Sequence, residues 1–206
     1  EETVIGELLR LALTPSTMHR YLDESLDSLF EGIPWLKQEN LGGIFLVDEN
    51  RNNVLNLVSD QKMDEPVRES CSEVIFGECP CGRAASEQSV QFSSIMDRNQ
   101  SCKLRHKTEQ PSAQISLPIL ADEHLLGVMV LYVPSNYQKN EKELGFLKRV
   151  TDVFAMGISR LKTEFEIEHQ AYHDALTGLP NRRMLKDLLK QELSLANRRK
   201  LSGALL

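Results

Sequence analysis

The stretch HLLGVMVLYV, residues 124–133, decides the fold class of this chain. It is almost wholly apolar and mixes β-branched with aromatic residues, which is typical of a central strand buried on both faces. A second apolar stretch, AQISLPIL at residues 113–120, precedes it, and only the three residues ADE separate the two. The sequence therefore predicts two long strands here, the second of them at the centre of a sheet.

The segments before these strands predict the rest of the sheet and its covering helices. Residues 44–47 and 54–58 are short apolar runs joined by a polar turn, which indicates a β-hairpin. A brief strand is expected within residues 89–94, and residues 97–112 form a loop by composition. Helical patterns occupy residues 4–12, 16–32, 66–74, 82–87 and the stretch that begins at residue 141. This order predicts an α+β fold, a central antiparallel sheet flanked by helices.

Composition excludes several classes of protein. The 206 residues carry 24 basic and 30 acidic side chains, a net charge of −6, which argues against binding to a phosphate backbone. No run of 18 apolar residues is present and no secretory signal is visible, so we expect no membrane span. The four cysteines crowd together at positions 71, 79, 81 and 102, unlike a disulfide framework, and this favours a cytoplasmic protein with reduced thiols. The chain lacks an initiator Met, which suggests a piece of a longer protein.

A long helix is predicted from residue 141, because no Pro occurs before Pro180. Apolar residues recur along it in steps of three and four, and Thr151 and Glu168 weaken the resulting heptad seam. We expect the early turns to pack on the chain's own sheet and the turns from Ile158 onward to pair with a second copy as a coiled coil. The predicted homodimer seam consists of Leu144, Leu147, Phe154, Ile158, Leu161 and Phe165.

Four segments, GGIFLVD, FGECPCGRAA, ISLPI and LLGVMVLY, occur in an order and spacing that resembles a GAF domain over residues 17–161. The resemblance implies a pocket, enclosed by the sheet and the irregular segment, that holds a small molecule or cofactor. Which ligand it would hold stays unknown from the sequence.

A second resemblance lies in AYHDALTGLPNRRML, residues 171–185. Gly178 and Pro180 are expected to end one helix and Asn181 to cap the next. The segment resembles the start of a GGDEF domain, whose signature is D-x-LTGLxNRR. The matching residues are Asp174, Leu176, Thr177, Gly178, Leu179, Asn181, Arg182 and Arg183.

The GGDEF resemblance implies a parent protein that converts GTP into cyclic di-GMP. In that family the metal-binding aspartates and the GG(D/E)EF loop follow later, so Mg²⁺ and GTP are expected only in the missing part. We assign no catalytic residue here and expect this piece to be inactive alone.

These resemblances divide the chain into an N-terminal helix (1–15), a GAF sensory domain (16–140), an exit helix and linker (141–173) and a truncated GGDEF start (174–206). We expect a regulatory fragment of a bacterial diguanylate cyclase, in which the GAF ligand state acts through a dimeric signalling helix. Two alternatives stay open. The GAF domain could be a dimerisation scaffold without ligand, or the parent could be a receptor for cyclic di-GMP with a degenerate GGDEF domain.

Three interpretations of the cysteines remain open. Cys79, Cys81 and Cys102, with Cys71 or His106 as a fourth ligand, form a candidate site for zinc or an iron–sulfur centre. Cys-x-Cys is not the Cys-x-x-Cys spacing of structural zinc sites, and some GAF domains with a similar stretch carry histidines in the region that here reads QPSAQISLPI. In a redox interpretation, Cys81 lies at a helix N-terminus beside Arg83, which would favour its thiolate. In the third, the thiols only pack the start of a short helix.

Overall fold

A computed structural model describes the chain except residues 38, 94–111, 175–176 and 200–206. The chain forms two compact units, Glu1–Arg160 and Leu161–Leu206. Among the described residues, no helix combines the length and apolarity that a bilayer span requires.

The first unit contains a six-stranded sheet with the order β3-β2-β1-β6-β5-β4, in which every pairing is antiparallel. The strand β6 (His124–Pro134) lies between β1 (Gly42–Val47) and β5 (Ser112–Ala121), so the apolar stretch does form a central strand. The predicted hairpin is β1 and β2 (Val54–Gln61). The edges are β3 (Glu73–Ile75), which the sequence did not predict, and β4 (Gln91–Ser93), which it did.

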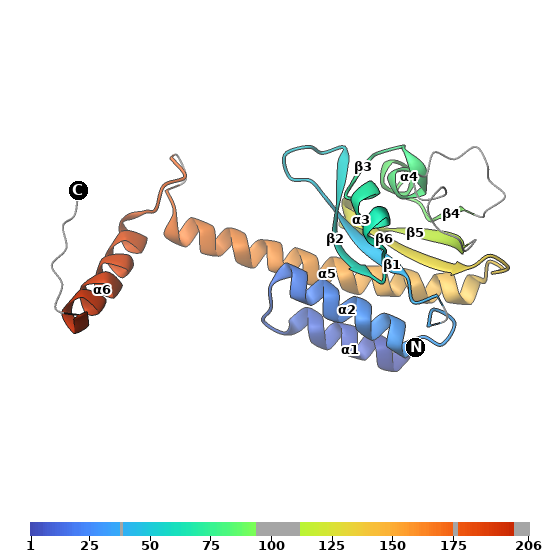
Figure 1. The fold of residues 1–206 in the computed structure, drawn as a ribbon, viewed down its shortest axis with the longest axis horizontal. Helices are drawn as coiled ribbons and strands as arrows, with labels where there is room; N and C mark the ends of the chain where they lie inside the picture. The colour runs from blue at the N-terminus through green and yellow to red at the C-terminus, as the bar shows by residue number, and fades with distance from the viewer. Residues whose placement is uncertain (38, 94–111, 175–176, 200–206) are drawn as a thin grey trace. The chain divides into compact units, whose positions relative to one another are not determined.

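One face of the sheet is covered by α2 (Met18–Gly32) and the first part of α5 (Glu141–Tyr172), and α1 (Glu2–Leu13) packs against α2 (Figure 1). The Tyr21 hydroxyl of α2 donates a hydrogen bond to the Val153 carbonyl of α5 at 3.2 Å, and the Tyr21 and Phe154 rings lie 6.1 Å apart. Gly42 of β1 makes room for this layer, because a Cβ there would lie 2.8 Å from Phe30 Cζ.

The other face of the sheet carries α3 (Glu65–Ser70) and α4 (Cys79–Glu87) (Figure 1). A second apolar cluster fills the space between these helices and the sheet. Its buried members are Phe45, Leu55, Met63, Val67, Cys71, Val74, Cys81, Ala84, Ala85, Val128 and Val130. The α+β architecture expected from the sequence is therefore confirmed, with one core on each face of the sheet.

The second unit contains the end of α5, a turn and α6 (Arg182–Arg199). Asp174 Oδ1 accepts hydrogen bonds from the Thr177 amide and hydroxyl at 3.0 and 2.9 Å, and Gly178 adopts a positive φ of 68°. Asn181 Oδ1 then accepts from the amides of Arg183 and Met184, which confirms the predicted N-cap. The signature residues therefore build the turn between the two helices.

Candidate functional site

The strongest candidate site lies at the start of α4, where the backbone is unusually constrained. Gly77 has a φ of 82°, and its amide donates to the Gly82 carbonyl at 2.8 Å. A Cβ at Gly82 would lie 2.2 Å from the Ile75 carbonyl oxygen, so no other residue fits this approach. The sequence predicted a helix from residue 82, whereas α4 begins at Cys79. Pro80 permits the earlier start, because the first turn of a helix needs no donor from proline.

Cys79 is the polarised thiol of this site. Its φ of 53° is a left-handed conformation that non-glycine residues seldom adopt. A hydrogen bond from the Cys81 thiol is the largest influence, and the amides of Gly82 and Cys81 and the charge of Arg83 act in the same direction. These groups outweigh burial and lower the pKa of Cys79 to about 6. The redox interpretation places the thiolate at Cys81, whereas the lowered pKa found here is that of Cys79.

Cys81 is only 5% exposed, and a side chain of the strand β5 donates a hydrogen bond to its sulfur. The Gln114 amide Nε2 donates to Cys81 Sγ at 3.1 Å and lies 2.9 Å from Ser116 Oγ. A buried polar line thus runs from Ser116 and Gln114 of β5 through Cys81 to Cys79. Since buried polar groups are costly unless hydrogen-bonded, this line fixes α4 against β5 at one position.

The sequence pattern does not single out Gln114 and Ser116 as site residues. Both are buried, at 5% and 0% exposure, although they alternate with the apolar residues of AQISLPIL. Such alternation normally indicates a solvent-facing side of a strand. The signal that could have indicated their burial is the place of β5 inside the sheet, because helices cover both faces there.

The structure brings together two of the predicted metal ligands. Cys79 and Cys81 share one helical turn, and Cys71 lies in the same apolar cluster. No disulfide joins these three thiols, and the described part of the chain holds no group of three or more His, Cys, Asp or Glu side chains arranged for a metal ion. Cys102 and His106 lie outside the described residues, so the metal site stays a prediction.

The predicted dimer seam is mostly buried within the single chain. Ile158, Leu147 and Phe154 are each 0% exposed, and Leu144 and Leu161 are buried at 7% and 8%. Phe165, in contrast, is 67% exposed. The sequence predicts that the seam faces a partner from Ile158 onward, but among these six residues only Phe165 is exposed. The coiled coil itself stays a prediction.

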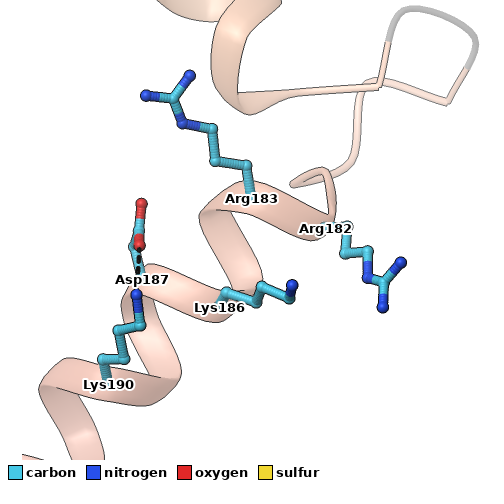
Figure 2. Close-up of a pocket in the computed structure, with 5 residues that line it drawn as sticks. All are labelled: Arg182, Arg183, Lys186, Asp187 and Lys190. Carbon is cyan, nitrogen blue, oxygen red and sulfur yellow. Dashed lines mark ion pairs between the residues drawn. The ribbon is translucent and has the colours of Figure 1, made fainter.

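The signature residues of the second unit have structural positions. Leu176 lies outside the described residues, Leu179 is 64% exposed, and Arg183 places its guanidinium 5.3 Å from the centre of the Tyr172 ring. A hollow of about 360 Å³ is bordered by Arg182, Arg183, Lys186, Asp187 and Lys190 (Figure 2). All five side chains are exposed on one helix, and Figure 2 shows Arg182 and Arg183 pointing apart, so they do not converge on a ligand.

The fold defines the class of protein. Three solved structures illustrate it: the GAF domain of a phosphoenolpyruvate-protein phosphotransferase from Coxiella burnetii, the free methionine-R-sulfoxide reductase from Neisseria meningitidis, and the GAF domain of the corresponding phosphotransferase from Acinetobacter. Their TM-scores are 0.66, 0.63 and 0.60 at identities of 14%, 17% and 14%. The matches cover 80%, 78% and 78% of this chain and 95%, 89% and 93% of the others. At these identities the likeness establishes the GAF fold alone.

The sequence then places the chain more narrowly. The GAF domain family model matches residues 19–159, so the chain belongs to the GAF family. The model of the diguanylate cyclase GGDEF domain matches residues 171–206. The chain matches no curated protein. A GAF domain followed by the N-terminal portion of a GGDEF domain is the organisation of a sensory, regulatory fragment of a diguanylate cyclase.

Proposed function

We propose that this chain is the input part of a diguanylate cyclase, in which the state of the GAF domain controls cyclic di-GMP synthesis through two paired α5 helices. One observation carries the proposal. The 32-residue helix α5 begins shortly after the central strand β6 and continues to Tyr172, two residues before the signature residue Asp174. A single helix that links both domains is an element through which a change in one can act on the other.

The second core of the GAF domain supports a sensor over a pure scaffold. A scaffold without a ligand would be expected to fill this region with large apolar side chains only. The polar line from Ser116 and Gln114 to Cys79 instead places hydrogen-bonding groups between α4 and the sheet and a half-buried thiol at the start of α4. Polar groups that converge in an apolar surrounding are typical of sites that recognise a small molecule or cofactor.

Exposed apolar residues on the later turns of α5 support pairing with a second copy. Phe165 is 67% exposed and follows the heptad spacing of the buried seam, whereas Ile167 is 62% exposed and lies off the seam. These two residues therefore form a matched pair for testing the dimer, because they are equally accessible and differ in their position on the helix.

Sedimentation velocity of the wild type, Phe165→Asp and Ile167→Asp tests the proposal. We expect a dimer that Phe165→Asp dissociates and Ile167→Asp leaves intact, with unchanged circular dichroism of the GAF domain. In the complete cyclase, Phe165→Asp should lower cyclic di-GMP synthesis. A wild-type monomer, or a dimer that responds equally to both changes, would contradict the proposed pairing.

A further inference from the structure

Two histidine rings stack on one face of α5, at its C-terminal end. His169 and His173 are four residues apart, and their ring centroids lie 4.1 Å apart with the planes only 8° from parallel. The Phe165 ring lies 6.1 Å from the His169 ring, one turn earlier on the same face. His169 is exposed and His173 is half-buried, so both imidazoles can be reached from solvent. The two rings therefore form a pair of accessible nitrogen ligands at the end of one helix.

The hydrogen bonding of His173 leaves one of its ring nitrogens available. Its Nδ1 lies 3.3 Å from the His169 carbonyl oxygen. A carbonyl oxygen can only accept a hydrogen bond, so Nδ1 carries the proton and Nε2 carries the free lone pair. A bond of this kind from the other ring nitrogen is what orients histidines that bind metal ions in proteins. His173 is thereby prepared to act as a ligand through Nε2.

The separation of the two rings suits a single metal ion. The 4.1 Å between the centroids is about twice a zinc–nitrogen bond of about 2.0–2.1 Å, so a small rotation about the Cβ–Cγ bonds would bring both Nε2 atoms to one ion. Imidazole nitrogens bind zinc, nickel and copper in preference to magnesium and calcium. The site also lies at the C-terminal end of a 32-residue helix, where the helix dipole attracts a cation.

We propose that His169 and His173 bind one divalent transition-metal ion, of the class of Zn²⁺, Ni²⁺ and Cu²⁺, as a clamp across the last turn of α5. Water completes the coordination, because the described part of the molecule places no third His, Cys, Asp or Glu side chain beside them. A site with two protein ligands and water is more open than the four-ligand sites of structural zinc. It shares no residue with the predicted cysteine site.

An ion held by both rings would stabilise the turn that leads from α5 to α6. The His173 amide donates to the His169 carbonyl at 2.8 Å, and His173 pairs with Pro180 as an isolated β-bridge. Opening of this turn would separate the two imidazoles, so the bound ion favours the closed turn. At an ion concentration of about ten times Kd, amide exchange that requires the opening should slow about tenfold. As a regulator of the cyclase this inference rests on the function proposed above, whereas metal binding does not depend on it.

Carbethoxylation of histidine by diethyl pyrocarbonate tests the site in the whole chain. The reagent modifies a free imidazole nitrogen, and a bound ion blocks that reaction. After treatment with a chelator, the chain is titrated with buffered free Zn²⁺, labelled and digested with trypsin. Cleavage after Lys162 and Arg182 releases both imidazoles on one peptide without a cysteine, so zinc bound at thiols leaves its labelling unchanged. Half-protection should occur at a Zn²⁺ concentration at least about tenfold lower than for a single imidazole, because the second ligand binds intramolecularly.

Two exposed histidines elsewhere in the chain are matched controls for a single imidazole. Nδ1 of His19 and Nδ1 of His124 lie 3.1 and 2.9 Å from a backbone carbonyl oxygen, so each of these residues also offers Nε2 alone. Trypsin separates them on the peptides 11–20 and 108–139. The comparison therefore holds the tautomer constant and changes only the number of imidazoles.

Single substitutions complete the test. In His169→Asn and in His173→Asn, the remaining imidazole should need the same Zn²⁺ concentration as His19 and His124. Zn²⁺ should slow hydrogen exchange of residues 163–182 in the wild type and in neither variant. Equal protection of all the histidine peptides, unchanged protection in both variants, or protection that weakens on dilution, as for a site shared between copies, would each overturn the proposal. Each readout reports metal binding within one chain, so its failure is distinguishable from a failure of the dimer, which sedimentation reports.

Discussion

The aromatic ring of Tyr21 lies against Gly157, so that a Cβ on the glycine would come within 2.3 Å of Tyr21 Cζ. Tyr21 is 1% exposed and its hydroxyl is bonded to the Val153 carbonyl, so the ring cannot move aside without losing a buried hydrogen bond. The helix α5 contains two glycines, Gly145 and Gly157. Only Gly157 lies where α2 comes close to α5.

Gly157→Ala should destabilise the GAF domain by about 1–2 kcal/mol, because overpacking a core outweighs the gain in helix propensity. Gly145→Ala is the matched control on the same helix. Nothing lies within 4 Å of a Cβ at Gly145, so this change should instead stabilise by up to about 1 kcal/mol. Urea denaturation followed by circular dichroism measures both. Equal stabilisation by the two substitutions would contradict the packing described here.

Alkylation of Cys79 by iodoacetamide should depend on pH with a midpoint near 6. An ordinary cysteine has a midpoint of about 8.5, so Cys79 should be about 90% thiolate at neutral pH where an ordinary thiol is about 3%. The Cys81 thiol is the largest cause of the lowered pKa, so Cys81→Ala should move the midpoint upward. A wild-type midpoint that stays at 8 or above would contradict the assigned polarisation.

The same lowered pKa has a consequence for stability. Because the folded pKa lies below the unfolded value, the thiolate stabilises the fold fully above a pH of about 8.5, and this contribution is lost as the pH falls through about 6. The contribution of the thiolate to stability is measured by comparing the urea midpoints of the wild type and Cys79→Ser from a pH of about 6 to a pH of about 8.5. The difference should grow with pH in favour of the wild type.

Metal binding is the competing use of these thiols, and the ligand set Cys79, Cys81 and Cys102 makes its own prediction. Anaerobically purified protein would contain one zinc or iron centre per chain, which both Cys81→Ser and Cys102→Ser would remove. An occupied site would also protect Cys79 from iodoacetamide, since a bound thiolate is no longer free to react. Elemental analysis and a UV–visible spectrum decide the matter, and a colourless, metal-free protein would exclude the ligand set.

Asn181 has two separable roles at the start of α6. Its Oδ1 caps the amides of Arg183 and Met184, and its Nδ2 donates to the Ala171 carbonyl at 2.9 Å. Asn181→Ala should cost about 1 kcal/mol of local stability and speed amide exchange at both capped residues. Asn181→Asp keeps the acceptor and should preserve that protection. Hydrogen exchange measured by NMR compares the two variants. Equal exchange rates at the Arg183 and Met184 amides in Asn181→Ala and Asn181→Asp would contradict the cap.

The sequence predicted best where one local pattern determined the structure. The apolar run of β6 required a central strand, and the hairpin of β1 and β2 followed from its polar turn. Burial that depends on tertiary neighbours was not predictable. Gln114 and Ser116 have the spacing of a solvent-facing row, yet α4 covers them. The heptad position of Ile158 is compatible with packing against a partner helix or against its own domain. In the structure Ile158 is buried within its own chain.

The turn held by Asn181 also bears on how such proteins are assembled in evolution and in the laboratory. The backbone N–H of Asn181 donates to the Tyr172 carbonyl, and its side-chain Nδ2 donates to the Ala171 carbonyl. These two hydrogen bonds join the last turn of α5 to the first turn of α6 as one preformed connector. A foreign input helix fused before Ala171 would inherit this connector intact. Each residue added to that helix would turn the foreign domain by about 100° around its axis, so functional chimeras should recur at lengths that differ by whole heptads.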